Sequence, residues 1–293
     1  MAVLSSPPAA SPLAARRSRS LRRATDGAIL ALTVAFAILW LLPILWVVTM
    51  SLKPNAELMR STAGFIPLPF TLDNYINLLK METVPRWLMH SLIVAVTMTA
   101  LVLIVSSMAG YAFARLRFPF KKTLFLLVMA GLMVPEQSIF IPLHTMFSAW
   151  GLHNSHVALV MPRVAVPIGV FLMMQFFRSI PKELEEAAEI DHASRLTVFL
   201  KIMLPLSVPA LTTLGLFTFI FAWNDFLWPL VSATRADMYT VTVGLASIQS
   251  NFAFSEGLGS VMASAVFASL PIMLLFLIFQ RFIVAGVAMN AGK

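Results

Sequence analysis

The chain has 293 residues, of which 59% are hydrophobic and only 12% are charged. Soluble domains contain about 25% charged residues, so this composition indicates a protein whose solvent is largely lipid. The absence of cysteine excludes disulfides, thiol catalysis and cysteine metal sites. Half of the net charge of +8 comes from residues 1–27, where arginines mainly set membrane orientation, so we predict no nucleic-acid partner.

The chain divides into a short basic tail and one long apolar region. Residues 1–26 are rich in Ser, Pro, Ala and Arg without an apolar period, and they predict a disordered tail. Residues 27–293 predict a single transmembrane domain. It contains six apolar stretches of about 20 residues or more, the length that crosses a hydrocarbon core of about 30 Å. The predicted spans are 27–50, 88–114, 123–147, 157–177, 206–231 and 260–281.

The distribution of Lys and Arg predicts the orientation of these spans. With the N-terminus inside, 15 of the 21 basic residues fall on the inner side, five fall on the outer side, and Arg163 lies within a span. Cytoplasmic segments of membrane proteins carry such an excess of positive charge. We therefore expect both termini, and the polar segment between spans four and five, to lie in the cytoplasm.

Spans three and four contain ionisable residues, which are costly in a membrane and usually face a cavity or a partner. Pro135-Glu136-Gln137 interrupts span three, where a proline frees backbone groups that need water or a neighbour. Glu136 and Gln137 are therefore candidates for a substrate path, although helix packing explains them equally well. Arg163 in span four either meets a polar or anionic substrate or extends to the outer interface.

Span five carries a cluster of polar and aromatic residues: Trp223, Asn224, Asp225 and Trp228. In one interpretation they line a substrate path, where the carboxylate and amide bond sugar hydroxyls and the indoles stack on sugar faces. In the other, the indoles belong to an interfacial aromatic belt and the polar pair makes a structural bond to another helix. Both interpretations stay open.

Residues 178–205, between spans four and five, are unusually polar. Five of the 13 acidic residues of the chain fall within nine positions: Glu183, Glu185, Glu186, Glu189 and Asp191. Glutamates favour the positive N-terminal end of a helix, and alanines favour both helix formation and close approach. We predict a helix from Pro181, a turn near His192 and Ala193, and a second helix from Arg195 to Met203. Leu204-Pro205 is expected to end the second helix at the membrane boundary.

This segment resembles the cytoplasmic EAA loop of ABC-importer permeases. The matching positions are Glu186-Ala187-Ala188, Asp191, Ala193, Phe199, Ile202, Leu204-Pro205 and Pro209. In that family the loop fits a cleft in the ATPase subunit and carries its motion to the spans. The resemblance implies an ATPase-coupling site formed by Glu185, Glu186, Ala187, Ala188, Glu189, Asp191, His192, Ala193, Leu204 and Pro205. The family usually has Gly at the position of His192, so this turn must accept a side chain, with His192 in a left-handed conformation.

Other segments extend the resemblance towards the carbohydrate-uptake branch and its smaller maltose-type permease. These segments are Ser51–Pro54, Gly110–Arg115, Trp223–Leu230 and the tail from Gln280. The resemblance implies an all-α polytopic protein of the bacterial cytoplasmic (inner) membrane, with six transmembrane helices and a cytoplasmic helix-turn-helix coupling loop. It also implies a heterodimer with a second permease, two ATPase subunits and an extracytoplasmic sugar-binding protein.

Motifs for catalysis are missing from the sequence. No G-x-x-x-x-G-K-[ST], H-E-x-x-H or G-x-S-x-G occurs. We therefore predict that the chain is not an enzyme and binds no cofactor, and that ATP and Mg belong to a partner ATPase. His153 and His156 have a spacing that suits a metal, but without an acidic neighbour we predict no metal site.

The expected function is that of a permease subunit that imports a sugar or oligosaccharide by alternating access as its ATPases close. An ion-coupled secondary transporter is one alternative, which the absence of a convincing internal repeat disfavours. A membrane assembly protein that transports nothing is the other. The basic balance hints at an acidic oligosaccharide, but most of the basic residues are predicted to be cytoplasmic and cannot meet incoming substrate.

Overall fold

The computed structural model describes residues 12–60, 66–255 and 257–291, with side chains over 25–58, 66–248 and 257–280. Every regular element in these ranges is a helix. Within them, three helices are long and apolar enough to cross a membrane, and three further pairs of bent helices pass the same test together. The prediction of an all-α polytopic protein is confirmed, and six spans result if each bent pair counts as one.

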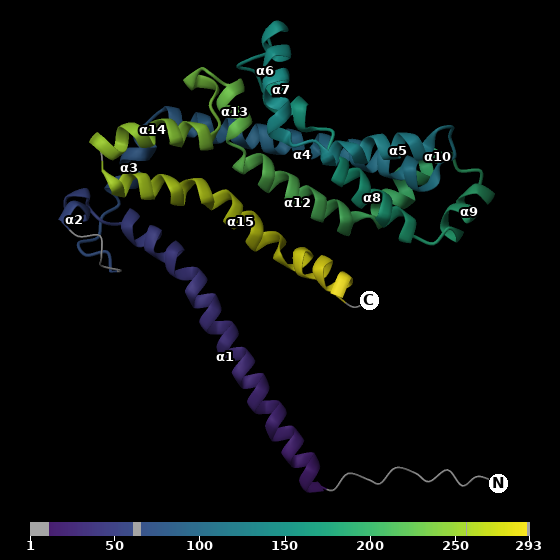
Figure 1. The fold of residues 1–293 in the computed structure, drawn as a ribbon, viewed down its shortest axis with the longest axis horizontal. Coiled ribbons are helices and arrows are strands. Elements are labelled where there is room, and N and C mark those ends of the chain that lie inside the picture. Colours follow the sequence, from purple (N-terminus) through teal and green to yellow (C-terminus); the bar gives the residue numbers. More distant parts are fainter. Residues whose placement is uncertain (1–11, 61–65, 256, 292–293) are drawn as a thin grey trace.

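The first helix, α1 (Pro12–Ser51), leaves the helical bundle and packs only towards its C-terminal end (Figure 1). Residues 25–45 are exposed, as expected of a helix that is covered by lipid or by another protein. Because α1 begins at Pro12, part of the tail predicted over residues 1–26 is helical. Proline is tolerated at a helix start, and the Ala, Leu and Arg residues that follow favour helix formation. Residues 1–11 lie outside the described part of the chain.

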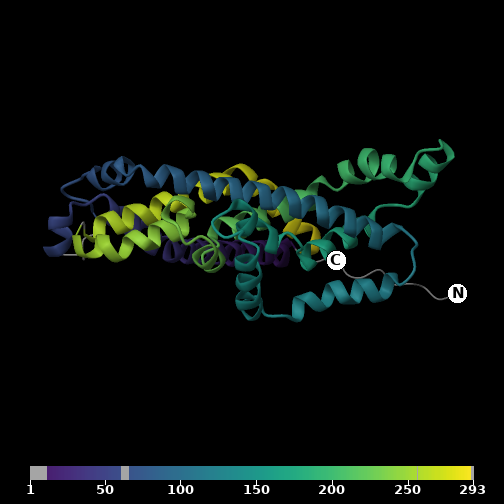
Figure 2. The ribbon, with the colours of Figure 1, turned by 90° about the horizontal axis from the view of Figure 1, so that it is seen from above.

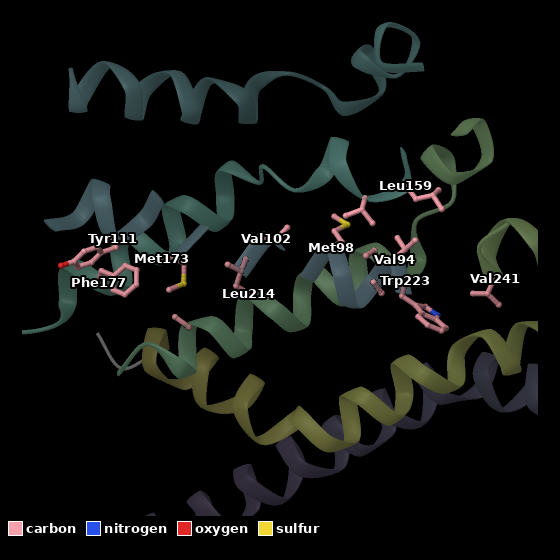
Figure 3. Packing of buried hydrophobic residues seen from close by; sticks show 14 of the residues in the cluster. Val94, Met98, Val102, Tyr111, Leu159, Met173, Phe177, Leu214, Trp223 and Val241 are labelled. Atoms are coloured by element: carbon pink, nitrogen blue, oxygen red, sulfur yellow. The ribbon is translucent and has the colours of Figure 1, made fainter. Parts of the chain in front are cut away.

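The core forms around α4 (Thr83–Arg115), which packs against α8 (Pro167–Ser179) and α12 (Val208–Asn224). Figure 3 shows buried side chains of this core, from Tyr111 and Phe177 at one end to Val241, which lies outside these three helices, at the other. The backbones of α4 and α8 approach closely at Gly110, where an added Cβ would lie 2.7 Å from the Cβ of Met173.

The predicted spans three, four and five are not continuous helices. Span three consists of α5 (Lys121–Ala130) with the 3₁₀ turn Gly131–Met133, followed by the 3₁₀ turn Glu136–Ile139 and α6 (Phe140–Ala149), at an angle of 95°. Span four consists of α7 (His156–Val160) with the 3₁₀ turn Met161–Arg163, and α8, at 52°. Span five consists of α12, an extended Asp225, and α13 (Leu227–Ser232). The third bent pair lies at the start of α12, which is bent by 75° from the preceding helix Arg195–Leu206.

Prolines account for two of these breaks. A residue that precedes proline is pushed out of the helical region, and both Val134 and Val166 have extended backbones before Pro135 and Pro167. The short helices α6, α7 and α13 consequently project together from the bundle (Figures 1 and 2). The break after α12, at the extended Asp225, has no such signal, because the residue that follows Asp225 is Phe226 and not a proline.

The remaining helices extend the two ends of the molecule. At one end lie α2 (Asn55–Arg60), α3 (Asp73–Lys80) and α14 (Val241–Ser255), near the start of α15 (Leu258–Ala291) (Figure 1). A 3₁₀ turn, Ala236–Met238, leads from α13 towards α14. At the opposite end, α9 (Glu183–Ile190) and α10 (Arg195–Val198) project beyond the ends of α4 and α8 (Figures 1 and 2). This second end contains the predicted coupling loop.

Candidate functional site

The helix α9 presents most of its side chains to the outside. Glu183, Glu186, Ala187 and Glu189 are exposed, whereas Ala188 is buried against the core and Glu185 is half-buried. The acidic residues in the first turn lie at the positive end of the helix dipole, as predicted. The loop is therefore attached through one face, and an acidic face remains open.

The end of α9 forms a compact hydrogen-bonded turn. The N–H of Ala193 donates to the carbonyl of Ala188, and the N–H of His192 donates to that of Glu189, each at 3.0 Å. These two bonds define a Schellman motif, which requires a left-handed residue at its centre. His192 occupies that position with φ of 55°, so the predicted left-handed conformation is confirmed.

Because left-handed backbone strains any residue with a Cβ, His192 gives a testable prediction. His192→Gly is expected to stabilise the loop slightly, by up to about 1 kcal/mol, and to preserve activity. His192→Val should destabilise it, because a β-branched side chain is the least compatible with positive φ. Thermal unfolding of the purified protein in detergent measures both changes, and equal midpoints for the two variants would contradict this description of the turn.

The second helix of the loop is longer than predicted. Ser194 caps α10 by accepting a hydrogen bond from the N–H of Thr197 at 3.2 Å. The helix continues through a π-helical segment, Phe199–Met203, into α11 (Leu204–Leu206). It therefore ends at Leu206, one residue beyond the predicted stop at Leu204-Pro205. The wider π-helical turn before Pro205 accommodates the hydrogen bond that proline cannot make.

The corner between this helix and α12 lies at Ser207. Its hydroxyl donates to the carbonyls of Met203 and Leu204 at 2.9 and 3.0 Å, and the residue is completely buried. The helix axes of Arg195–Leu206 and Val208–Asn224 differ by 75° at this point. The loop is thus joined to α12 by a short corner whose polar groups are paired within the chain.

Arg115, at the end of α4, attaches the loop to the bundle. Its Nη2 donates to the carbonyl of Phe177 at 2.6 Å and to that of Ile180, both at the C-terminal end of α8. Its Nε lies 2.9 Å from Glu185 Oε1, as an ion pair without hydrogen-bond alignment. The side chains of Arg115 and Glu185 are only 6% and 19% exposed. Burial raises the pKa of Glu185, and Arg115 opposes that rise.

An aromatic cluster reinforces this attachment. The ring of Tyr111 lies 5.8 Å from that of Phe177 and 5.1 Å from that of Phe199, measured between centroids. These three residues come from α4, from α8 and from the second helix of the loop, respectively. Aromatic pairs in this range contribute about 0.5–1.5 kcal/mol each beyond their burial. A displacement of the loop must therefore move these helices or break the cluster.

Large apolar side chains accompany the acidic residues on the exposed surface of the loop. They are Leu184, Ile190, Leu196 and Leu200, and Ile190 is the most exposed at 79%. Because this loop lies outside the predicted spans, lipid does not explain their exposure. Exposed apolar side chains gathered with charged ones are typical of protein-binding surfaces. We refer to these four residues with Glu183, Glu186, Ala187 and Glu189 as the docking surface.

The ionisable residues singled out in spans three to five lie together. Arg163 Nη2 is 2.6 Å from Glu136 Oε1, and Arg163 Nη1 is 2.9 Å from Asp225 Oδ2. The side chains of Arg163 and Asp225 are each 10% exposed, and that of Glu136 is 40% exposed. We call these three residues the ion cluster. Arg163 is paired inside the protein in this conformation. It therefore neither extends to the outer interface nor faces a substrate as a free cation.

The other predicted path residues are placed differently. Trp223 and Trp228 are buried, and their indole N–H groups donate to the carbonyls of Ala268 at 3.1 Å and Ala158 at 2.8 Å. In this conformation both indoles support neighbouring helices and present no face to a sugar. Gln137 and Asn224 are exposed, and the Asn224 amide nitrogen donates to its own helix at Ile220.

Two further features lie apart from the ion cluster. An apolar cavity of about 320 Å³ lies between α4, α12 and α15, with Thr99, Gly215 and Phe279 among its lining residues. The spacing of His153 and His156 does not bring their rings together. His153 lies against His144, and His156 lies 2.9 Å from His90, measured between ring nitrogens.

Comparison with known proteins gives the context for these sites. A family model described as "Binding-protein-dependent transport system inner membrane component" matches residues 103–289, which contain both the docking surface and the ion cluster. The trehalose transport system permease protein SugB of Mycobacterium tuberculosis (strain CDC 1551 / Oshkosh) is 37% identical over 276 residues. The match covers 93% of this chain and 98% of that protein.

A second relative agrees with this family match, and one solved structure shares the fold. The arabinooligosaccharides transport system permease protein AraQ of Halalkalibacterium halodurans is 35% identical over 268 residues, covering 89% of this chain and 95% of that protein. A chain in the crystal structure of a bacterial ABC transporter involved in the import of the acidic polysaccharide alginate has a TM-score of 0.78 and 20% identity. The match covers 94% of this chain and 99% of the chain in that structure. At this identity the likeness shows the fold alone.

Proposed function

The chain belongs to the family of binding-protein-dependent transport system inner membrane components, and on that premise we propose that it is the permease subunit of an ATP-driven importer of a sugar or oligosaccharide. Its relatives are named as permeases for trehalose and for arabinooligosaccharides, which supports a carbohydrate as the cargo. The candidate cargoes are both neutral and acidic oligosaccharides.

The docking surface is the observation that carries this proposal. It combines acidic and apolar side chains on α9 and on the second helix of the loop, at one end of the bundle (Figure 2). We propose that a partner ATPase binds there and hydrolyses ATP with its own Mg. Closure of the ATPase dimer would move α9, and the corner at Ser207 would pass this motion to α12. Ala193, Asp191, His192, Leu204 and Pro205 shape the loop that presents this surface.

The membrane arrangement follows from the same proposal. Spans three and four are each a bent helix pair, and α12 belongs to span five, which gives six spans with α1, α4 and α15. The excess of Lys and Arg supports a cytoplasmic position for both termini and for the docking surface. The exposed length of α1 supports a second permease subunit as a partner, forming a heterodimer with the transport path between the two subunits. Gln137, Asn224 and the exposed part of Glu136 are the proposed path residues of this chain. A sugar-binding protein would deliver the cargo from outside.

Reconstitution with the second permease, the ATPase and the binding protein tests the function. We expect ATP hydrolysis to rise when the binding protein carries its sugar, and sugar to accumulate in vesicles that are supplied with ATP. A panel of neutral and acidic oligosaccharides identifies the cargo. Uptake that persists in ATP-depleted vesicles under an ion gradient alone would instead establish a secondary transporter. An assembled complex that transports nothing in the panel, with no sugar-stimulated ATP hydrolysis, would favour the assembly protein.

A further inference from the structure

The ion cluster joins three interruptions of the helical spans. Glu136 begins the 3₁₀ turn that directly follows the 95° bend in span three. Arg163 ends the 3₁₀ turn that directly precedes the 52° bend in span four. Asp225 is the extended residue that follows the last residue of α12. Each charged residue is thus located at a break between helical segments, and the three breaks are held to one guanidinium group.

Aromatic contacts strengthen the central position of Arg163. Its guanidinium carbon lies 5.0 Å from the centroid of the Phe221 ring in α12 and 5.9 Å from that of the Phe140 ring in α6. A cation over an aromatic face is attracted by the ring quadrupole, more strongly where water is excluded. Arg163 therefore interacts by charge and by ring contact with both α12 and the η2–α6 segment, where η2 is the 3₁₀ turn Glu136–Ile139.

The helix α12 connects this cluster to the docking surface. It runs without interruption from Val208 to Asn224, with its only proline, Pro209, in the first turn. One end is fixed to the loop through the buried Ser207, and the other end carries Asp225. A continuous helix moves largely as a rigid body, so a displacement at Ser207 reaches Asp225 and, through it, Arg163.

We propose that Arg163 is a positioning residue that couples the far end of α12 to the η2–α6 segment, so that motion of the α9–α10 loop reaches the bend in span three. This inference rests on the proposed function, because the motion begins with ATPase closure. Arg163 and Asp225 satisfy each other and are almost inaccessible, which disfavours direct substrate binding by either. Glu136 is the most exposed of the three side chains. We therefore expect the η2–α6 segment, which begins with Glu136, to be the part whose exposure changes during the motion.

The test uses a single reporter cysteine. The chain contains no cysteine, so Ser138→Cys in the exposed turn beside Glu136 provides a unique thiol. In the complete transporter complex, the labelling rate of this thiol by a membrane-impermeant maleimide is measured without nucleotide and with the ATPases trapped by ATP and vanadate. We expect the two rates to differ by about fivefold or more, as a coupled two-state element would give.

Substitution at Arg163 should remove this difference. With Arg163→Met, which keeps an unbranched apolar stem and loses the charge, we expect equal labelling rates in the two states and a fall of about tenfold in sugar imported per ATP hydrolysed, which corresponds to about 1.4 kcal/mol of coupling. The complex should still contain the ATPase, because the docking surface is untouched. Arg163→Lys should restore part of the difference, since an ammonium group can pair with one carboxylate but lacks the planar fork.

Glu136→Gln keeps the inference falsifiable if Arg163→Met fails to assemble. Glu136 is partly exposed, so this variant should fold, and the rate difference should fall at least by half because one arm of the cluster is neutral. An unchanged labelling difference in either variant overturns the role of Arg163. Failure of the proposed function is distinct: the unsubstituted complex would then show neither ATP-dependent uptake nor a bound ATPase.

Discussion

Glu186→Lys is expected to abolish stable association with the ATPase and to lower ATP-driven uptake by more than about tenfold. Glu186 is exposed in the first turn of α9 and belongs to the docking surface. Reversing its charge places a cation at the positive end of the helix dipole and removes an acidic group from the contact. Unfavourable charge pairs at an interface cost several kcal/mol, and about 1.4 kcal/mol is already tenfold in affinity. Co-purification of the ATPase and uptake into vesicles measure the two effects.

The matched control for this prediction is Glu82→Lys. Glu82 is an exposed acidic residue before α4, at the opposite end of the molecule, and makes no capping hydrogen bond. The same change of charge there should leave ATPase association intact. If Glu186→Lys behaves like Glu82→Lys in both assays, α9 is not the ATPase contact.

Arg115→Met is expected to detach the loop from the bundle. The substitution leaves Glu185 without its cation and two carbonyls at the end of α8 without their donor. Removing one partner of a buried ion pair costs about 3–5 kcal/mol, and here part of that cost is local to the loop. We expect faster backbone hydrogen exchange across residues 183–193 and loss of uptake. Exchange monitored by mass spectrometry measures the local effect directly.

Arg117→Met is the control for Arg115. Arg117 is an exposed arginine two positions away, and the same substitution there should leave exchange in the loop unchanged. Equal exchange in the two variants would show that the loop is held by its apolar contacts alone. A neutral Gln at Glu185 should reproduce a smaller part of the Arg115 effect, because the carbonyl contacts of Arg115 remain.

The helices of the α9–α10 loop could be predicted from the sequence and from its resemblance to the EAA loop. Its helices and its turn follow from local signals: acids before alanines, a short turn and a second apolar helix. The left-handed conformation of His192 follows from the resemblance, because the family usually has Gly at that position. The second helix ends at Leu206, one residue beyond the predicted stop at Leu204-Pro205, and it contains a π-helical segment that a local pattern does not reveal. The role of Arg115 was missed as well. A basic residue at the end of a long helix indicates a possible helix cap, but only the fold brings the end of α8 to it.

The ion cluster could not be predicted from the sequence. Glu136, Arg163 and Asp225 were each recognised as unusual within a span, but their pairing depends on the geometry of three separate helix breaks, two of which are bends of 95° and 52°. Those angles result from packing between helices, which sequence periodicity does not encode.

The position of a tryptophan within a span is ambiguous from the sequence for a similar reason. Interfacial belts and cores both contain it, and only the hydrogen bonds of Trp223 and Trp228 to backbone carbonyls show that these two are buried supports.

The central claim is that α9 lies against a partner ATPase, and one cross-linking measurement tests it most directly. Ala187 is exposed in the middle of α9, and Ala187→Cys introduces the only thiol of the chain. A photoactivatable cross-linker attached to this cysteine in the assembled transporter should capture the ATPase subunit, and ATPase assembly should protect the thiol from a water-soluble maleimide. A thiol that remains fully reactive after assembly, with no ATPase in the cross-linked product, would contradict the claim.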